Sequence, residues 1–142
     1  MWWIFALFSA FFGALTAILG KIGVSGIDSN IATAIRTVVI LIVAWGIVFA
    51  VSDVRTIGTI SRRSLVFLVL SGITTGLSWL CYYRALKEGK ASAVAPIDKS
   101  SLVMVILLAA VFLDEPLTWK SIVGSILIVC GMLVTVLPIS CG

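Results

Sequence analysis

The chain alternates between long apolar runs and short polar segments. Five runs are long enough to cross a hydrocarbon core of about 30 Å, which takes roughly 20 helical residues. They cover residues 2–20, 31–51, 64–83, 91–113 and 121–137. These runs are uniformly apolar, whereas strands of a membrane β-barrel alternate between apolar and polar side chains. We therefore predict an all-α fold, an integral membrane bundle of five transmembrane helices.

The first apolar run has about the length of a signal peptide, but no lysine or arginine precedes it. Because similar runs follow it, we expect a first membrane helix that the mature protein retains. The connecting segments are short and rich in turn-forming or charged residues. We therefore expect residues 1–142 to form a single transmembrane domain.

Composition supports a membrane protein. Hydrophobic residues make up 61% of the chain and charged residues 11%, against about 45–50% and about 25% in soluble domains. A soluble domain of this size could not bury so much apolar surface. We expect the lipid bilayer to be its main partner, in the inner membrane of a bacterial or archaeal cell.

The net charge of +4 does not indicate a nucleic-acid partner, because the basic residues are dispersed among the apolar runs. The chain has no histidine, and its three cysteines stand at unrelated spacings without a CxxC pair. It contains no Ser-His-Asp set, metal-ligand cluster or phosphate-binding loop. We therefore expect neither an enzyme, nor a cofactor, nor a metal site.

The basic loop residues are balanced between the two sides of the membrane. One side has four (Arg55, Arg62, Arg63 and Lys120) and the other also has four (Lys21, Arg84, Lys87 and Lys90). The positive-inside rule needs an imbalance to set orientation. Two interpretations stay open: weak signals select one orientation, or the protein inserts both ways and forms an antiparallel homodimer.

Three ionisable residues lie within predicted spans, where a charge costs about 2.5–3.5 kcal/mol on insertion scales. Arg36 lies roughly 8 Å into the second span at 1.5 Å per residue. It either snorkels to the headgroups or faces a cavity. Asp98 lies roughly 10 Å into the fourth span, and its short side chain needs a partner, a proton or water.

Pro96 gives Asp98 two interpretations. A proline inside the helix would kink it beside a charge, which is a recurring transporter feature. Alternatively, the helix begins near Pro96 and Asp98 lies in its first turn. Lys99 follows Asp98 directly, and adjacent residues do not face each other on a helix. We therefore expect no close Asp98–Lys99 pair and regard Arg36 as a better partner for Asp98.

Aromatic and small residues give weaker signals. Trp79 and Tyr83 lie near the end of the third span, where an interfacial belt is the default explanation and a cavity role the alternative. Small residues at four-residue spacing predict close helix packing in lipid. They are Ser9, Gly13 and Ala17 in the first span, and Gly72 and Gly76 in the third.

Residues 82–133 resemble the EamA-domain family of the drug/metabolite transporter superfamily. The resemblance rests on Pro96, on the turn at 113–117, and on Gly124 and Gly131 in the fifth span. Upstream, Lys21 and the segment 32–37 are also similar to that family. Typical members have two five-helix domains in tandem, whereas this chain resembles the half-size members, which implies a dimer.

The resemblance implies a secondary transporter subunit for a small metabolite or drug-like solute. Arg36, Asp98, Lys99, Trp79 and Tyr83 would line the pathway, and Pro96 would shape the fourth helix. The first span has no acidic residue, unlike that of the small multidrug resistance family, so that family's proton coupling is not carried over. The alternatives are a lipid-linked flippase subunit and a non-transporting membrane scaffold or partner subunit.

Overall fold

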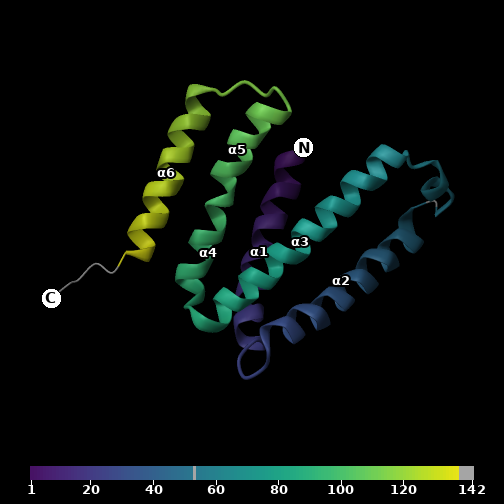
Figure 1. The fold of residues 1–142 in the computed structure, drawn as a ribbon, viewed down its shortest axis with the longest axis horizontal. Helices are drawn as coiled ribbons and strands as arrows, with labels where there is room; N and C mark the ends of the chain where they lie inside the picture. Colours follow the sequence, from purple (N-terminus) through teal and green to yellow (C-terminus); the bar gives the residue numbers. More distant parts are fainter. Residues whose placement is uncertain (53, 138–142) are drawn as a thin grey trace. The chain divides into compact units, whose positions relative to one another are not determined.

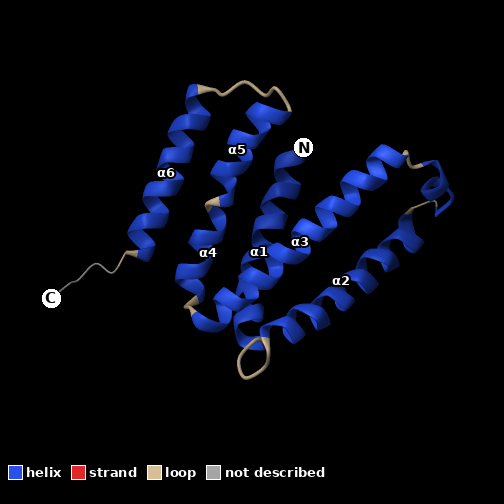
Figure 2. Ribbon diagram, viewed as in Figure 1, coloured by secondary structure: helices blue, strands red, loops and turns tan. Residues whose placement is uncertain are grey.

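A computed structural model describes residues 1–52 and 54–137, and every regular element in that part of the chain is a helix. Figure 1 shows the helices in chain order, and Figure 2 shows the same view coloured by secondary structure. Five helical segments in these residues are long and apolar enough to cross a membrane. The prediction of an all-α bundle with five membrane spans is therefore confirmed.

The chain divides into two compact units, Met1–Glu88 and Gly89–Gly142. Unit 1 contains α1 (Trp2–Gly23), α2 (Ser29–Val51), the short 3₁₀ helix η1 (Val54–Thr59) and α3 (Arg62–Glu88). Unit 2 contains α4 (Ala91–Lys99), α5 (Ser101–Phe112) and α6 (Trp119–Val136). That residues 1–142 form a single domain stays a prediction.

In unit 1, α3 packs against both α2 and α1. The chain reverses through η1, so α2 and α3 run antiparallel (Figure 1). The small core lies where the end of α1, the start of α2 and the end of α3 meet. Its buried side chains are Ala17, Val24, Ser29, Ala32, Thr33, Tyr83 and Leu86. Most other apolar side chains of the unit are exposed, as expected for helices whose solvent is lipid.

Polar side chains cap the helices where the apolar runs begin. The carboxylate of Asp28 accepts hydrogen bonds from the amides of Asn30, at 2.8 Å, and Ile31, at 3.3 Å. Thr118 Oγ1 accepts one from the amide of Ser121 at 3.2 Å. Such caps provide acceptors for amides that have no partner within the helix. Leaving these amides unpaired near lipid would cost free energy. They explain why α2 and α6 begin about two residues before the predicted spans.

In unit 2, α4, α5 and α6 pack against one another. The fourth span is divided at Ser100, whose amide donates to the carbonyl of Ile97 at 3.0 Å. Pro96 lies inside α4, which begins at Ala91. The alternative in which the helix begins near Pro96 is therefore wrong. After α5 the chain turns at Asp114, whose φ of 53° is in the left-handed region that aspartate tolerates better than most residues.

None of the three predicted close-packing glycines marks a tight helix contact in the described chain. A Cβ atom added to Gly13, Gly72 or Gly76 would meet no atom within 4 Å. Ala17 is buried, but the close approach comes one turn later, at Gly20. The four-residue spacing correctly indicated that α1 packs closely, but it pointed to Gly13 and not to Gly20. Spacing alone does not determine which face of a helix contacts its neighbour.

Candidate functional site

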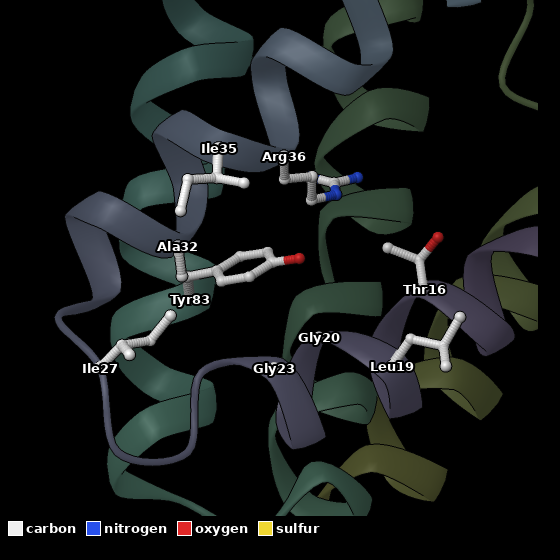
Figure 3. Close-up of a pocket in the computed structure, with 9 residues that line it drawn as sticks. All are labelled: Thr16, Leu19, Gly20, Gly23, Ile27, Ala32, Ile35, Arg36 and Tyr83. Atoms are coloured by element: carbon white, nitrogen blue, oxygen red, sulfur yellow. The ribbon is translucent and has the colours of Figure 1, made fainter.

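A pocket of about 350 Å³ opens between the three long helices of unit 1. Figure 3 shows Arg36, Tyr83 and Thr16 around the same space. Most of its wall is apolar, and these three residues provide the polar groups. The lining residues come from α1, the following loop, α2 and α3: Thr16, Leu19, Gly20, Gly23, Ile27, Ala32, Ile35, Arg36 and Tyr83.

Arg36 lies on aromatic rings of α3. Its Cζ atom is 3.4 Å from the centroid of the Trp79 ring and 5.5 Å from that of Tyr83. The two rings are four residues apart on one helix face, with centroids 6.0 Å apart. A guanidinium over such rings is stabilised by about 0.5–2 kcal/mol, the larger value applying when it is desolvated. The side chain therefore borders the pocket and lies against α3.

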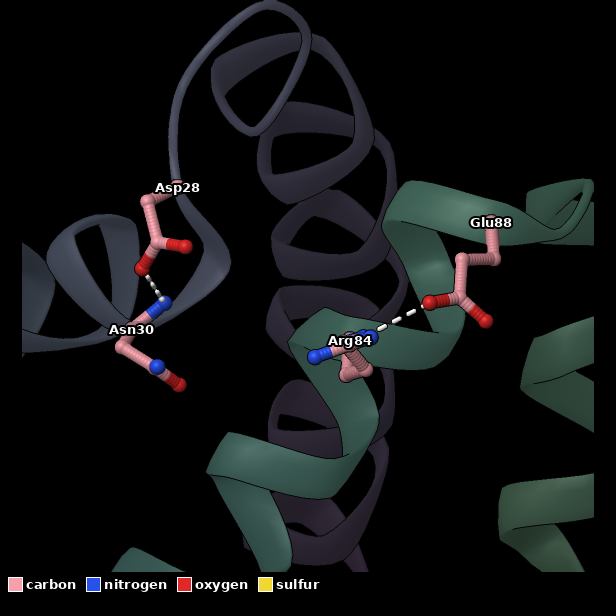
Figure 4. Close-up of polar contacts among 4 residues, drawn as sticks. All are labelled: Asp28, Asn30, Arg84 and Glu88. Atoms are coloured by element: carbon pink, nitrogen blue, oxygen red, sulfur yellow. Dashed lines mark hydrogen bonds and ion pairs between the residues drawn. The ribbon is translucent and has the colours of Figure 1, made fainter.

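The acidic side chains described in unit 1 are engaged elsewhere. The Asp28 carboxylate caps α2, and Glu88 Oε1 accepts a hydrogen bond from Arg84 Nε at 2.6 Å (Figure 4). Within the described residues of that unit, the partners of the Arg36 guanidinium are the two aromatic rings. An aromatic face attracts the cation, but it offers no oxygen to accept hydrogen bonds from the five N–H groups.

Two contacts between α1 and α3 hold Tyr83 in place. A Cβ atom on Gly20 would lie 3.0 Å from Tyr83 Oη and 3.3 Å from its Cζ, so the ring fits only against a residue without a side chain. One turn of α3 further on, the carbonyl oxygen of Leu86 accepts a hydrogen bond from Lys21 Nζ at 2.6 Å. Carbonyls at the end of a helix lack partners within it, and a lysine ammonium also complements the helix dipole there.

Asp98 and Lys99 lie in unit 2, at the end of α4. Lys99 Nζ is 3.7 Å from Asp98 Oδ2, and both side chains are partly exposed. The expectation that these neighbours form no ion pair is therefore wrong, although 3.7 Å is longer than a charge-assisted hydrogen bond. A pair of Asp98 with Arg36 stays a prediction, because the two residues belong to different units.

The structure brings together three of the five predicted pathway residues: Arg36, Trp79 and Tyr83. Their role in a solute pathway stays a prediction. Sequence reasoning missed Thr16 and Gly20, which line the same pocket from α1. The sequence contained one signal for Gly20, its place three residues after Ala17, since residues at i and i+3 share a helix face.

These observations define a multi-pass α-helical integral membrane protein with a pocket in its first three spans. The model of the EamA-like transporter family matches residues 1–137, so the chain belongs to that family. A Sinorhizobium protein described as an uncharacterized transporter is 48% identical over 132 residues, covering 93% of this chain and 94% of the relative. A Methanocaldococcus jannaschii protein described as uncharacterized is 31% identical over 72 residues, covering 51% of this chain and 53% of its own. No solved structure matches the chain.

The family and the relative described as a transporter support membrane transport as the activity. They point to a non-enzymatic protein, in agreement with the sequence prediction. They also confirm the resemblance found in the sequence, with a match over residues 1–137.

Proposed function

We propose that this protein is a subunit of a secondary transporter for a small metabolite or drug-like solute. The observation that carries the proposal is the pocket of unit 1, where Arg36 lies on Trp79 and beside Tyr83. Charged residues within membrane spans are rare and normally face a solute or ion pathway. A mostly apolar pocket with a few convergent polar groups is typical of small-molecule sites.

Asp98 and Lys99 contribute from unit 2 in this proposal. Asp98 is the carboxylate well inside a predicted span, and it stands two residues after Pro96. Its partner Lys99 is 3.7 Å away and exposed, so this ion pair is weak. Coupling of transport to protons through Asp98 is the simplest use of such a carboxylate.

The active assembly in this proposal is a homodimer, with an antiparallel arrangement of its copies as one form. Support comes from the balanced basic loops and the many exposed apolar side chains. Many transporters place their site between two inverted repeats, and two oppositely inserted copies would build such a repeat. The proposed location is the inner membrane of a bacterial or archaeal cell.

The test is uptake and export in proteoliposomes, with a panel of labelled solutes and an imposed pH gradient. We expect wild type to move one solute class, and we expect Arg36→Gln and Asp98→Asn to reduce its rate at least tenfold. Arg84→Gln is the matched control, because Arg84 is exposed and paired with Glu88 outside the lining of the Arg36 pocket. If all variants insert and fold but no solute moves, the transporter proposal is wrong. Movement of labelled lipid alone would assign a flippase instead.

A further inference from the structure

We propose that the pocket of unit 1 binds an organic anion, through a carboxylate or phosphate group that pairs with Arg36. This inference rests on the proposed function and names the class of its solute. It also distinguishes Arg36 from Lys21 and Arg84, whose charged groups donate hydrogen bonds to oxygen atoms of the protein.

The pocket has a charged residue in its lining. Arg36 is the charged residue among those that line it. Arginine keeps its proton at any pH that proteins experience. The two described carboxylates of unit 1, Asp28 and Glu88, bond to the α2 amides and to Arg84. The pocket wall therefore has a positive charge that no described acid of this unit neutralises.

The Arg36 guanidinium lies on an aromatic ring and keeps its N–H groups for hydrogen bonds to a ligand. Stacking on Trp79 fixes the guanidinium in place without using its capacity to donate to oxygen. A planar, fixed guanidinium is well suited to carboxylate or phosphate, which it can bind with two parallel hydrogen bonds. The hydroxyl of Tyr83 points into the same space and can donate to a further anionic oxygen, and Thr16 borders that space from α1 (Figure 3).

The remaining wall of the pocket is mostly apolar. Leu19, Ile27 and Ile35 present apolar side chains beside the polar group, and Gly20 and Gly23 add no side chain. The volume of about 350 Å³ is within the range of small-molecule sites. Such a wall favours a solute with an apolar body and one anionic end, and it disfavours cations by charge repulsion from Arg36.

The anionic group has two possible sources, a free organic anion or the phosphate of a lipid headgroup. Benzoate is a suitable probe for the first, because benzylammonium and benzyl alcohol match its ring and differ in charge. The binding of each labelled probe is measured on protein in phosphatidylcholine nanodiscs, with empty nanodiscs to correct for partition into lipid. The second source is tested in nanodiscs that also contain phosphatidylglycerol, with native mass spectrometry to count the retained lipid.

We expect saturable benzoate binding at least tenfold tighter than that of either matched probe. Loss of a charged hydrogen-bond partner weakens binding about tenfold or more, so Arg36→Gln should weaken benzoate binding by at least that factor. Arg36→Lys should retain part of the benzoate affinity, and Arg84→Gln should retain all of it. Two results together would assign the headgroup phosphate as the anion. Phosphatidylglycerol would displace benzoate, and wild type would retain the lipid whereas Arg36→Gln would not.

The inference is overturned if benzylammonium or benzyl alcohol binds as tightly as benzoate, or if Arg36→Gln leaves benzoate binding unchanged. It is also overturned if neither benzoate nor phosphatidylglycerol shows binding that depends on Arg36. Transport in proteoliposomes is a separate readout. Binding without transport would contradict the proposed function alone, and Arg36-dependent transport of a cation in place of an anion would contradict the anion alone.

Discussion

Gly20 of α1 lies directly against Tyr83 of α3, so closely that a Cβ atom on Gly20 would be 3.0 Å from the tyrosine hydroxyl oxygen. Tyr83 is buried, and the same ring borders the pocket and lies beside Arg36. This contact therefore links helix packing to the geometry of the proposed binding site.

Gly20→Ala should destabilise unit 1, because the new methyl group must displace the Tyr83 ring. Overpacking of this kind typically costs about 1–3 kcal/mol. Thermal unfolding of the detergent-solubilised protein measures the effect. Gly13→Ala is the matched control, since a Cβ atom there meets nothing within 4 Å. Equal melting temperatures for the two variants would show that α1 and α3 do not pack as described.

Lys21→Met should also destabilise the protein, because the carbonyl of Leu86 would lose the ammonium group that donates to it at 2.6 Å. A hydrogen bond from a charged group contributes about 1.5–3 kcal/mol. Lys87→Met is the comparison, since Lys87 is an exposed lysine in the last turn of α3. Chemical denaturation of both variants provides the measurement, and a loss no greater for Lys21→Met than for Lys87→Met would argue against the contact.

Arg36 and Trp79 should be energetically coupled. A double-mutant cycle with Arg36→Gln and Trp79→Leu should give a coupling free energy of unfolding of about 0.5–2 kcal/mol, as expected for a partly desolvated cation–π contact. The cycle of Arg84→Gln with Trp79→Leu is the control, because Arg84 pairs with Glu88. A coupling near zero in the first cycle would mean that Arg36 points to the headgroups.

If the protein inserts in both orientations, reporters fused to its C-terminus should be active on both sides of the membrane. Replacing Arg62 and Arg63 by alanine should leave mainly one orientation, because it removes two of the four basic residues on that side. Replacing Lys87 and Lys90 by alanine should favour the opposite orientation. A wild-type reporter active on one side only would exclude dual insertion.

Hydropathy predicted the five spans because lipid requires long apolar helices whatever their packing. The ends were less predictable. The helix α3 continues to Glu88, five residues beyond the predicted span. Leu86 is buried in the core there and its carbonyl accepts a hydrogen bond from Lys21, while the exposed Arg84–Glu88 pair adds little. Hydropathy does not detect such an amphipathic end.

The candidate site was predictable in part. Arg36 stood out because a charge breaks an apolar run, and Trp79 and Tyr83 because they are aromatic residues near a span end. The contact of Arg36 with these two rings depends on how α2 is rotated about its axis. The sequence of a uniformly apolar helix does not determine that rotation. Gly20 had the same limitation: a glycine marks a close approach only once the neighbouring ring is known.

The interruption of the fourth span gives it different mechanical properties from the other four. Pro96 has no amide hydrogen, so the carbonyl of Ser92 cannot receive the usual bond from four residues later. The regular helix also stops at Ser100 before it resumes at Ser101. Two interruptions within about one turn lower the bending stiffness of this span at the position of Asp98. In the described chain, α1, α2, α3 and α6 are uninterrupted helices, so an applied force or a bound solute would bend the fourth span first.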